Sequence, residues 1–444
     1  MDPIQLIASV IFLGSIVLIV TGWIDSVVAA MLGIIAMVVF GVMTDTQAFQ
    51  FVDWDVILIL LSIWIIAGYF GKTGVPELLA HIALRISKGR VAVFVTLVGM
   101  FAGLISMFID NVVIVLMFAP IIFHASRLFQ FSAFGPLLFL GLCANFMGTA
   151  LLLGDLPPQM LHSVSGIEFG GFIWHSGRPS SLLILCAAYG VTLLAFFAIF
   201  SKKYGGKKME FYSLEKKKAL DHIQDLRFAV VVCGIFVLTI VGMALRPIFG
   251  YHLGFIALLG AITLVLVFEL LKKSFRREIP SFEAVLSELD WRAIFFYVAL
   301  FALVGGLEHS GVIKLIADQI TPLIQSSLVA GTSLLYWITA PIVGIVEHDA
   351  YILTMLYVIR GLGKDHAINP WPLYWCLLWA GTLGSNLTIA GAPALFVAKN
   401  LAEKEDNRKV GLKEFLGYSV PYVIVSLVSC YLLALLIWVI PFQK

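Results

Sequence analysis

Charged residues are scarce in this chain of 444 residues. Only 13% of its residues are Asp, Glu, Lys or Arg, whereas 61% are hydrophobic and the mean hydropathy is +1.01. A soluble domain typically has about a quarter charged and about half apolar residues. Because this chain lacks the polar surface to cover itself in water, its composition predicts an integral membrane protein.

Motifs for enzyme chemistry are also lacking. The five cysteines are scattered without a CxxC pair, and no spacing of histidines, cysteines and acids predicts a metal site. Gly71-Lys72-Thr73 resembles the end of a phosphate-binding loop, but Ile66 stands where that motif requires a glycine. We therefore expect no enzyme, no cofactor and no nucleic-acid partner. Energy should come from an ion gradient, or from a separate ATPase subunit.

Long apolar runs are abundant. About 20 apolar residues are needed to span a bilayer, and candidate runs lie near 4–22, 26–44, 54–70, 91–124, 136–160, 180–200, 228–246, 252–271, 291–307, 327–359, 371–398 and 417–440. Two of them, 91–124 and 327–359, are too long for one crossing and too short for two. We interpret both as re-entrant helical hairpins whose tips lie at mid-depth, where surrounding protein or water must accommodate them.

Positive charge predicts the orientation. The segment 201–227 holds eight Lys and Arg residues, so we expect it to be cytoplasmic. Ten crossings then place all but six of the 29 Lys and Arg residues on the cytoplasmic side. This distribution predicts a multi-pass protein of the cell's inner (plasma) membrane with both termini outside.

An internal repeat appears at an offset of 237 residues. Asp53-Trp54 recurs as Asp290-Trp291 and Gly74-Val75 as Gly311-Val312, while Asp110-Asn111 aligns with Glu347-His348 and Gly154 with Gly391. Five crossings per half require the second copy to be inverted, which is typical of secondary transporters. We therefore predict an all-α membrane protein with two inverted repeats, 1–200 and 228–444, joined by the basic linker 201–227. Each repeat should contain five transmembrane helices and one re-entrant hairpin.

Acidic residues stand at both predicted hairpin tips. Asp110 and Asn111 interrupt the first apolar run, and Glu347, His348 and Asp349 interrupt the second. An ionised group inside a bilayer costs several kcal/mol unless water, a partner or an ion accompanies it. A salt bridge or a helix cap is one interpretation. A substrate or ion site is the interpretation we favour, because the two tips occupy matching positions.

Two further runs should be broken helices at the centre. The run 136–160 contains Gly154, Asp155 and two prolines, and 371–398 contains Gly391 and Pro393. Unwinding frees backbone groups and directs helix ends toward the centre. The nearby polar side chains would complete a site; these are Thr149, Asp155, Ser385, Asn386 and Thr388. Packing of small residues between helices is the alternative and would explain Gly148 and Ala150, but Asp155 beside two prolines fits it poorly.

Three segments resemble the ion transporter superfamily, in the branch of arsenical pump membrane proteins, D-type sodium/proton antiporters and P-protein permeases. They read ISMFIDNVVIVLMFAP (105–120), GTALLLGDLPP (148–158) and LGSNLTIAGAPA (383–394). The resemblance implies a homodimer with scaffold and transport domains that works by an elevator motion. It also implies that Asp110, Asn111, Gly154, Asp155, Asn386, Thr388 and Gly391 form the site. Glu347-His348 departs from the family's usual Asp-Asn pair, and Gln159 from its usual Asn.

The charge of the predicted site limits the substrate. Carboxylates 4 Å apart repel by several kcal/mol at the effective dielectric of a protein, so the acids disfavour di- and tricarboxylates. We favour proton-coupled efflux of arsenite or antimonite, which are neutral trihydroxides, and Cys143 could assist in binding them. Sodium/proton antiport, with Na+ as the coupling ion, is the alternative. An organic or inorganic anion permease is a less favoured interpretation.

Overall fold

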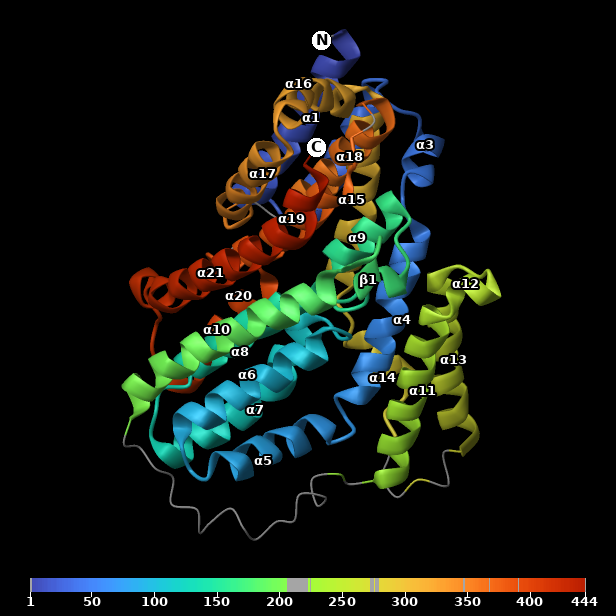
Figure 1. Cartoon of the computed structure of the whole chain (residues 1–444). Coiled ribbons are helices and arrows are strands. Elements are labelled where there is room, and N and C mark those ends of the chain that lie inside the picture. The colour runs from blue at the N-terminus through green and yellow to red at the C-terminus, as the bar shows by residue number, and fades with distance from the viewer. Residues whose placement is uncertain are drawn as a thin grey trace.

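The computed structural model describes residues 2–205, 223, 225–271, 275, 279–345, 348–366, 368–389 and 391–443. Helices make up most of these residues (Figure 1). The sheet in this part of the chain is one hairpin of two short strands, β1 (Trp174–His175) and β2 (Arg178–Pro179). The predicted all-α class is confirmed. Most of the basic linker, including Lys207, Lys208 and Lys216, lies outside the described residues.

The helices of the first half are α1 (Pro3–Thr21), α2 (Ser26–Val39), α3 (Asp45–Gln50), α4 (Trp54–Phe70), α5 (Val75–Ser87), α6 (Val91–Ser106), α7 (Asn111–Phe129), α8 (Phe134–Gly148), α9 (Leu156–Ser165) and α10 (Ser181–Tyr204), with a short 3-10 turn, η1 (Phe169–Phe172). The second half contains α11 (Leu226–Ala244), α12 (Arg246–Phe249), α13 (Leu253–Leu271), α14 (Phe282–Ser287), α15 (Trp291–His309), α16 (Val312–Ser326), α17 (Leu328–Val343), α18 (His348–His366), α19 (Trp371–Ser385), α20 (Pro393–Asp406) and α21 (Leu412–Ala434). A π turn (Leu435–Val439) and a 3-10 turn (Ile440–Phe442) extend α21.

The order of helices recurs at the spacing found in the sequence. Helices α4, α7, α8 and α9 begin 237 residues before α15, α18, α19 and α20. The residues that cap these helices recur with them. The Asp53 side chain accepts backbone N–H groups at the start of α4, and the Asp290 side chain accepts one at the start of α15. Gly74 and Gly311 both have φ of +82° where the next helix begins, a conformation that favours glycine. The two halves therefore use the same local signals to bend the chain.

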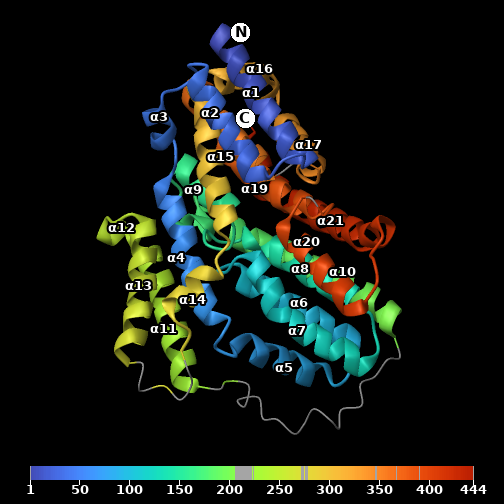
Figure 2. The same cartoon turned by 180° about the vertical axis from the view of Figure 1, so that it is seen from behind.

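Packing recurs between the halves as well. Helix α6 packs on α8 as α17 packs on α19, and α4 packs on α13 as α15 packs on α2. Figures 1 and 2 show α11 and α13 together beside α4, whereas α6, α7, α8 and α10 lie with α20 and α21 in a separate group. The turn between α6 and α7 and the start of α9 line one cavity together with residues of α4.

Within the described residues, six helices are long and apolar enough to cross a bilayer, or seven if α4 and α5, bent by 61°, count as one span. The sequence predicted ten crossings. The difference arises because several of the predicted spans form shorter apolar helices, among them α2 and α8. A helix of 14–16 residues rises too little to cross alone. The run 136–160 comprises most of α8, a non-helical segment and the first half of α9, and 371–398 comprises α19 and the start of α20.

Candidate functional site

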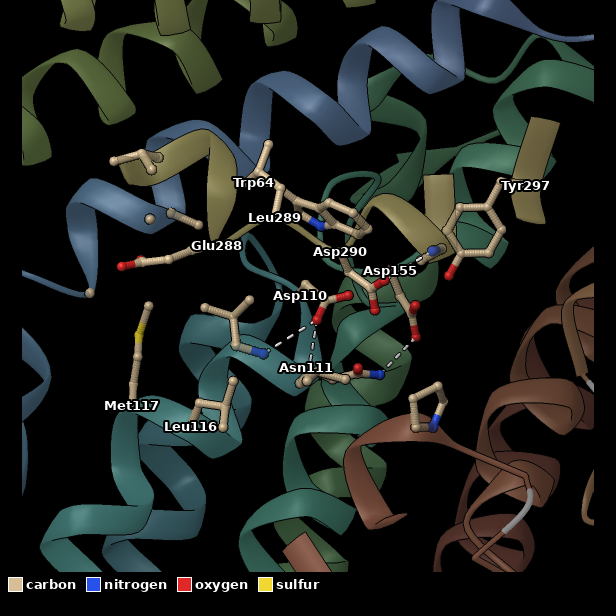
Figure 3. A pocket seen from close by; sticks show the side chains of 18 of the residues that line it. Trp64, Asp110, Asn111, Leu116, Met117, Asp155, Glu288, Leu289, Asp290 and Tyr297 are labelled. Carbon is tan, nitrogen blue, oxygen red and sulfur yellow. Dashed lines mark hydrogen bonds between the residues drawn. The ribbon is translucent and has the colours of Figure 1, made fainter. Parts of the chain in front are cut away.

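A cavity of about 760 Å³ lies where the two groups of helices meet (Figure 3). Its polar lining consists of Lys72, Asp110, Asn111, Asp155, Glu288, Asp290, Tyr297, His348 and Asp349. Its apolar lining includes Trp64, Val112, Val113, Leu116, Met117, Val285 and Leu289. Asp290 and Glu288 are exposed, so solvent reaches the cavity on the side of α14 and α15.

Asp110 and Asn111 reach the cavity because α6 ends and α7 begins there. The Asp110 carboxylate accepts the backbone N–H groups of Val112 at 2.9 Å and Val113 at 3.3 Å, which caps α7. A carboxylate is a strong N-cap and also complements the positive end of the helix dipole. Asp110 therefore serves as a helix cap, one of the two roles considered from the sequence, and lines the cavity as well.

Asp155 joins the first helix break to this hairpin. Its Oδ1 accepts the backbone N–H of Leu156 at 2.9 Å at the start of α9, and its Oδ2 accepts a hydrogen bond from Asn111 Nδ2 at 3.2 Å. Figure 3 shows the Asp110, Asn111 and Asp155 side chains gathered at one wall of the cavity. Residues 44 positions apart thus meet, because two helix starts point at the same space.

The second hairpin contributes His348 and Asp349 at the start of α18. Both side chains are about 95% buried, line the cavity, and lie 3.3 Å apart between His348 Nε2 and Asp349 Oδ1. Glu347, which the sequence predicted at this tip, lies outside the described residues. Its proposed role stays a prediction.

The other predicted residues do not line the cavity. Ser385 and Asn386 lie behind its wall and contact Asn145, while Thr388 donates a hydrogen bond to the carbonyl of Gly344. Thr149 is fully buried, and its carbonyl accepts a hydrogen bond from Ser181 Oγ at 2.8 Å. These groups form a supporting layer rather than the surface of the cavity.

Gly154 and Gly391 hold the two breaks close to other backbone. A Cβ atom at Gly154 would lie 2.1 Å from the carbonyl oxygen of Ser106, and one at Gly391 would lie 2.2 Å from that of Ser385. Neither position has room for a side chain. Both glycines therefore act through close backbone approach.

Asn145 was missed by sequence reasoning. It lies fully buried in α8, where its Oδ1 accepts a hydrogen bond from Asn111 Nδ2 at 2.9 Å. Its Nδ2 lies 3.0 Å from Ser385 Oγ and 3.1 Å from Asn386 Oδ1. Asn145 thus links the first hairpin to the break in the second half. A single amide in an otherwise apolar run was the signal that could have identified it.

Lys72, Glu288 and Asp290 were also missed as cavity residues. Lys72, which follows α4, forms an ion pair of 2.7 Å with Glu288 at the end of α14. Sequence reasoning assigned Lys72 to a cytoplasmic segment and used Asp290 only to align the repeat. The described lining residues include five carboxylates and this one lysine.

Cys143 does not line the cavity, contrary to the role considered for it in metalloid binding. The side chain is fully buried in α8, and its sulfur accepts a hydrogen bond from the Tyr422 hydroxyl at 3.7 Å. The sulfur also lies close to Gly99, where an added Cβ would be 3.1 Å away. The sequence suggested a role because Cys143 precedes a helix break, but the side chain points into the packing between helices.

Polar contacts hold α9 against the start of α4. Ser163 in α9 donates a hydrogen bond to Asp53 at the start of α4. His162 Nε2 lies 3.9 Å from Asp55 Oδ2 in the same helix, and His162 Nδ1 lies 2.5 Å from the Ile167 carbonyl. Helix α9 is therefore fixed to the start of α4.

Comparison with known proteins identifies the family. The model of a family described as citrate transporter, CitMHS, matches residues 16–380. The chain belongs to the CitMHS family. It is therefore a secondary transporter of the ion transporter type and not an enzyme, and the predicted membership of that superfamily is confirmed.

Several relatives of the chain are named as transporters. The chain is 28% identical to an uncharacterised transporter of Mycobacterium tuberculosis, over 98% of each chain. It is 26% identical to the human P protein over 96% of this chain, which corresponds to 59% of the P protein. The predicted resemblance to P-protein permeases is thus confirmed, whereas the arsenical pump branch stays a prediction.

Solved structures support the fold. The YdaH transporter of Alcanivorax borkumensis superposes with a TM-score of 0.57 at 15% identity, over 88% of this chain and 86% of that one. MtrF of Neisseria gonorrhoeae, described with a class of antimetabolite efflux pumps, gives 0.54 at 14% identity, over 92% and 85%. At such identities the likeness concerns the membrane transporter fold alone.

Proposed function

We propose that this CitMHS member couples the movement of a small neutral or cationic solute to a counterflow of protons. The observation that carries this proposal is the charge of the cavity. Five carboxylates line it, and the one lysine among its described lining residues is paired with Glu288. Carboxylates that water can reach in a membrane protein bind protons and cations, which is the chemistry an ion-coupled carrier needs.

Arsenite or antimonite efflux is the first activity to test. Both solutes are neutral trihydroxides near neutral pH, so they meet no repulsion from Asp110, Asp155 and Asp290. Carboxylate and amide oxygens accept hydrogen bonds from hydroxyl groups. The choice of these solutes rests on the sequence resemblance, and the cavity chemistry is compatible with it without requiring a thiol.

Sodium/proton antiport is the second candidate, favoured by the same acids. Asp110 and Asp155 offer oxygen ligands on neighbouring helix starts, where Na+ and H+ would compete for the same charge. In this activity the cation is both substrate and coupling ion. No further solute would be needed to drive proton flux.

The family description names citrate, which this cavity suits less well. A free tricarboxylate beside Asp110, Asp155 and Asp349 would be repelled by several kcal/mol per close pair of charges. Citrate could enter only after protons or bound cations had neutralised most of its charge. An organic anion permease therefore remains the third candidate.

The proposed mechanism is an elevator motion of two inverted repeats in a homodimer. The matched start positions of α4 and α15 and the recurring packing of α6 on α8 support the repeat. In this proposal the group that contains α6, α7, α8 and α10 moves against the group that contains α4, α11 and α13. Both termini would lie outside the inner membrane, and no separate ATPase subunit is needed for proton coupling.

A flux assay in everted membrane vesicles tests the proposal. Arsenite, antimonite, Na+, Li+ and citrate are supplied one at a time, citrate with and without a divalent cation, and proton movement is followed with a pH-sensitive dye. Arsenite accumulation driven by an imposed pH gradient supports the first candidate. Proton release on addition of Na+ alone supports the second.

Matched controls decide the result. Vesicles without the protein and vesicles with collapsed pH gradients give the background for every solute. Uptake of free citrate driven by the membrane potential, without any response to Na+, arsenite or antimonite, would contradict the proposed neutral or cationic solute.

A further inference from the structure

Asn145 forms hydrogen bonds with residues of both halves of the chain. It lies fully buried in α8, away from the cavity surface, and its side chain contacts Asn111 of the first hairpin and Ser385 and Asn386 of the second break. Thr382, its counterpart 237 positions later, has a hydroxyl and no amide, so this linkage exists in one half only.

The side-chain amide of Asn145 has more acceptors than it has hydrogens. Its two N–H bonds face three oxygens, those of the Thr382 carbonyl at 3.2 Å, Ser385 Oγ at 3.0 Å and Asn386 Oδ1 at 3.1 Å. Because the –NH₂ group is directed to the second half, its carbonyl oxygen must face Asn111. The contacts with the second half thereby direct the Asn145 oxygen, rather than its –NH₂ group, toward Asn111.

This orientation is passed on to Asn111. Since Asn145 Oδ1 accepts from Asn111 at 2.9 Å, the Nδ2 group of Asn111 must point toward Asn145. The same Nδ2 also donates to Asp155 Oδ2 at 3.2 Å, so both of its hydrogens are used. The polar atom that Asn111 retains for a ligand is its carbonyl oxygen, next to the Asp110 and Asp155 carboxylates (Figure 3).

We propose that Asn145 is a positioning residue that fixes the amide of Asn111 with its oxygen available to the cavity and thereby makes this wall selective for cations and hydrogen-bond donors. The inference rests on the proposed cation coupling and adds a residue and a reason for it. If the Asn111 amide were reversed, an N–H group would join the wall and would favour an anion. Asn145 does not touch the solute and acts through Asn111 alone.

Three variants separate this role from a structural one. Asn145→Leu keeps the branching of the side chain in a larger volume and forms no hydrogen bonds, so the Asn111 amide is held by its contact with Asp155 alone. Asn145→Asp keeps an oxygen that can accept from Asn111 but loses the donors to Ser385 and Asn386. Cys143→Ser changes another fully buried side chain of α8, which keeps an acceptor for Tyr422 and lies off the cavity.

The experiment measures proton flux in reconstituted vesicles over a pH series and a series of Na+ or arsenite concentrations, at equal amounts of monodisperse protein. For Asn145→Leu we expect the concentration at half-maximal flux to rise about tenfold, as for the loss of one to two net hydrogen bonds, and the pH profile to shift. Asn145→Asp should stay within about threefold of the wild type on the same scale. Cys143→Ser should match the wild type.

Several outcomes would overturn the inference. Wild-type half-saturation and pH profile in Asn145→Leu would show that Asn111 needs no positioning, and equal losses in Asn145→Leu and Asn145→Asp would show a structural role. If Asn145→Leu fails to reach the membrane, Asn145→Ala takes its place in the same comparison. This smaller variant also removes the hydrogen bonds of Asn145 but leaves space in the packing. A wild-type protein that moves neither Na+, arsenite nor protons would refute the proposed function itself, a result that is distinct from failure of the variants.

Discussion

Asp53 accepts a hydrogen bond from Ser163, whereas Asp290, its counterpart 237 positions later, is exposed at the cavity. Both aspartates cap corresponding helices, α4 and α15. The counterpart of Ser163 is Asn400 in α20, which is also exposed. The two halves thus have corresponding helices and capping residues, but the contact between Asp53 and Ser163 in the first half differs from the exposed Asp290 and Asn400 in the second. If the halves exchange arrangements during transport, the Asp53–Ser163 contact must open while an Asp290–Asn400 contact forms.

The first prediction concerns this exchange. Asp53→Cys with Ser163→Cys, in a chain whose five native cysteines are replaced, should be linked by a short bifunctional thiol reagent. Because the link holds α9 on α4, we expect it to stop coupled flux, and a cleavable linker should restore flux on reduction. The measurement is proton flux in vesicles before and after linking.

The pair Asp290→Cys with Asn400→Cys provides the matched test. It should link slowly in the absence of solute and faster during turnover, when the opposite arrangement is visited. Full activity of the linked Asp53/Ser163 pair, with each single variant as reference, would rule out the exchange.

The second prediction concerns the cavity carboxylates. Asp110→Asn and Asp155→Asn each remove a charge but keep a side chain that caps helices as well as aspartate does. We therefore expect both variants to fold and to lose proton-coupled flux. Asp45→Asn, at an exposed position in α3, should keep wild-type flux. Normal coupling in both cavity variants would remove these acids from the mechanism.

The features that could be predicted from the sequence have local causes. Asp110 and Asn111 interrupt an apolar run, and Gly154 and Asp155 precede two prolines, so both signals are visible within a few residues. The structure brings Asn111 and Asp155 to 3.2 Å at one cavity wall. The helix starts recur at the predicted offset of 237 because the same capping and glycine signals recur.

The features that were missed depend on tertiary packing. Asn145 looks like one polar residue in a buried helix, and only the approach of α19 gives it the partners Ser385 and Asn386. Lys72 and Glu288 are 216 residues apart and meet because α14 lies beside α4. The count of ten crossings stays a prediction, because a short apolar helix such as α2 or α8 lies within a membrane only with neighbouring helices around it.

The third prediction concerns close backbone packing at the breaks. A methyl group at Gly154 or Gly391 would meet a backbone oxygen at about 2 Å, and backbone cannot move aside as a flexible side chain can. Gly154→Ala and Gly391→Ala should each cost about 3 kcal/mol of stability and lower the melting temperature in detergent. We also expect the backbone at these helix breaks to be displaced in both variants, and transport flux to be lost.

Gly190→Ala is the control for the glycine variants. Gly190 lies within α10, and an added Cβ there would have nothing within 4 Å. Because alanine is a better helix former than glycine, this variant should be at least as stable as the wild type. Equal melting temperatures for Gly154→Ala and Gly190→Ala would contradict the packing argument.

The fourth prediction concerns acid sensitivity at the charged end of α20, outside the apolar spans. The Glu403 carboxylate pairs with Lys399 at 2.8 Å and accepts the Val410 backbone N–H at 2.7 Å, and these contacts lower its pKa to about 2. A carboxyl with a lowered folded-state pKa stabilises fully above its unfolded pKa of about 4.3 and loses this effect as the pH falls toward the folded value. Hydrogen exchange at the Val410 amide, corrected for its intrinsic rate, should therefore quicken over that range. Glu403→Gln should lack this pH dependence, and an unchanged Val410 protection in the wild type down to pH about 2 would show that the ion pair does not hold this turn.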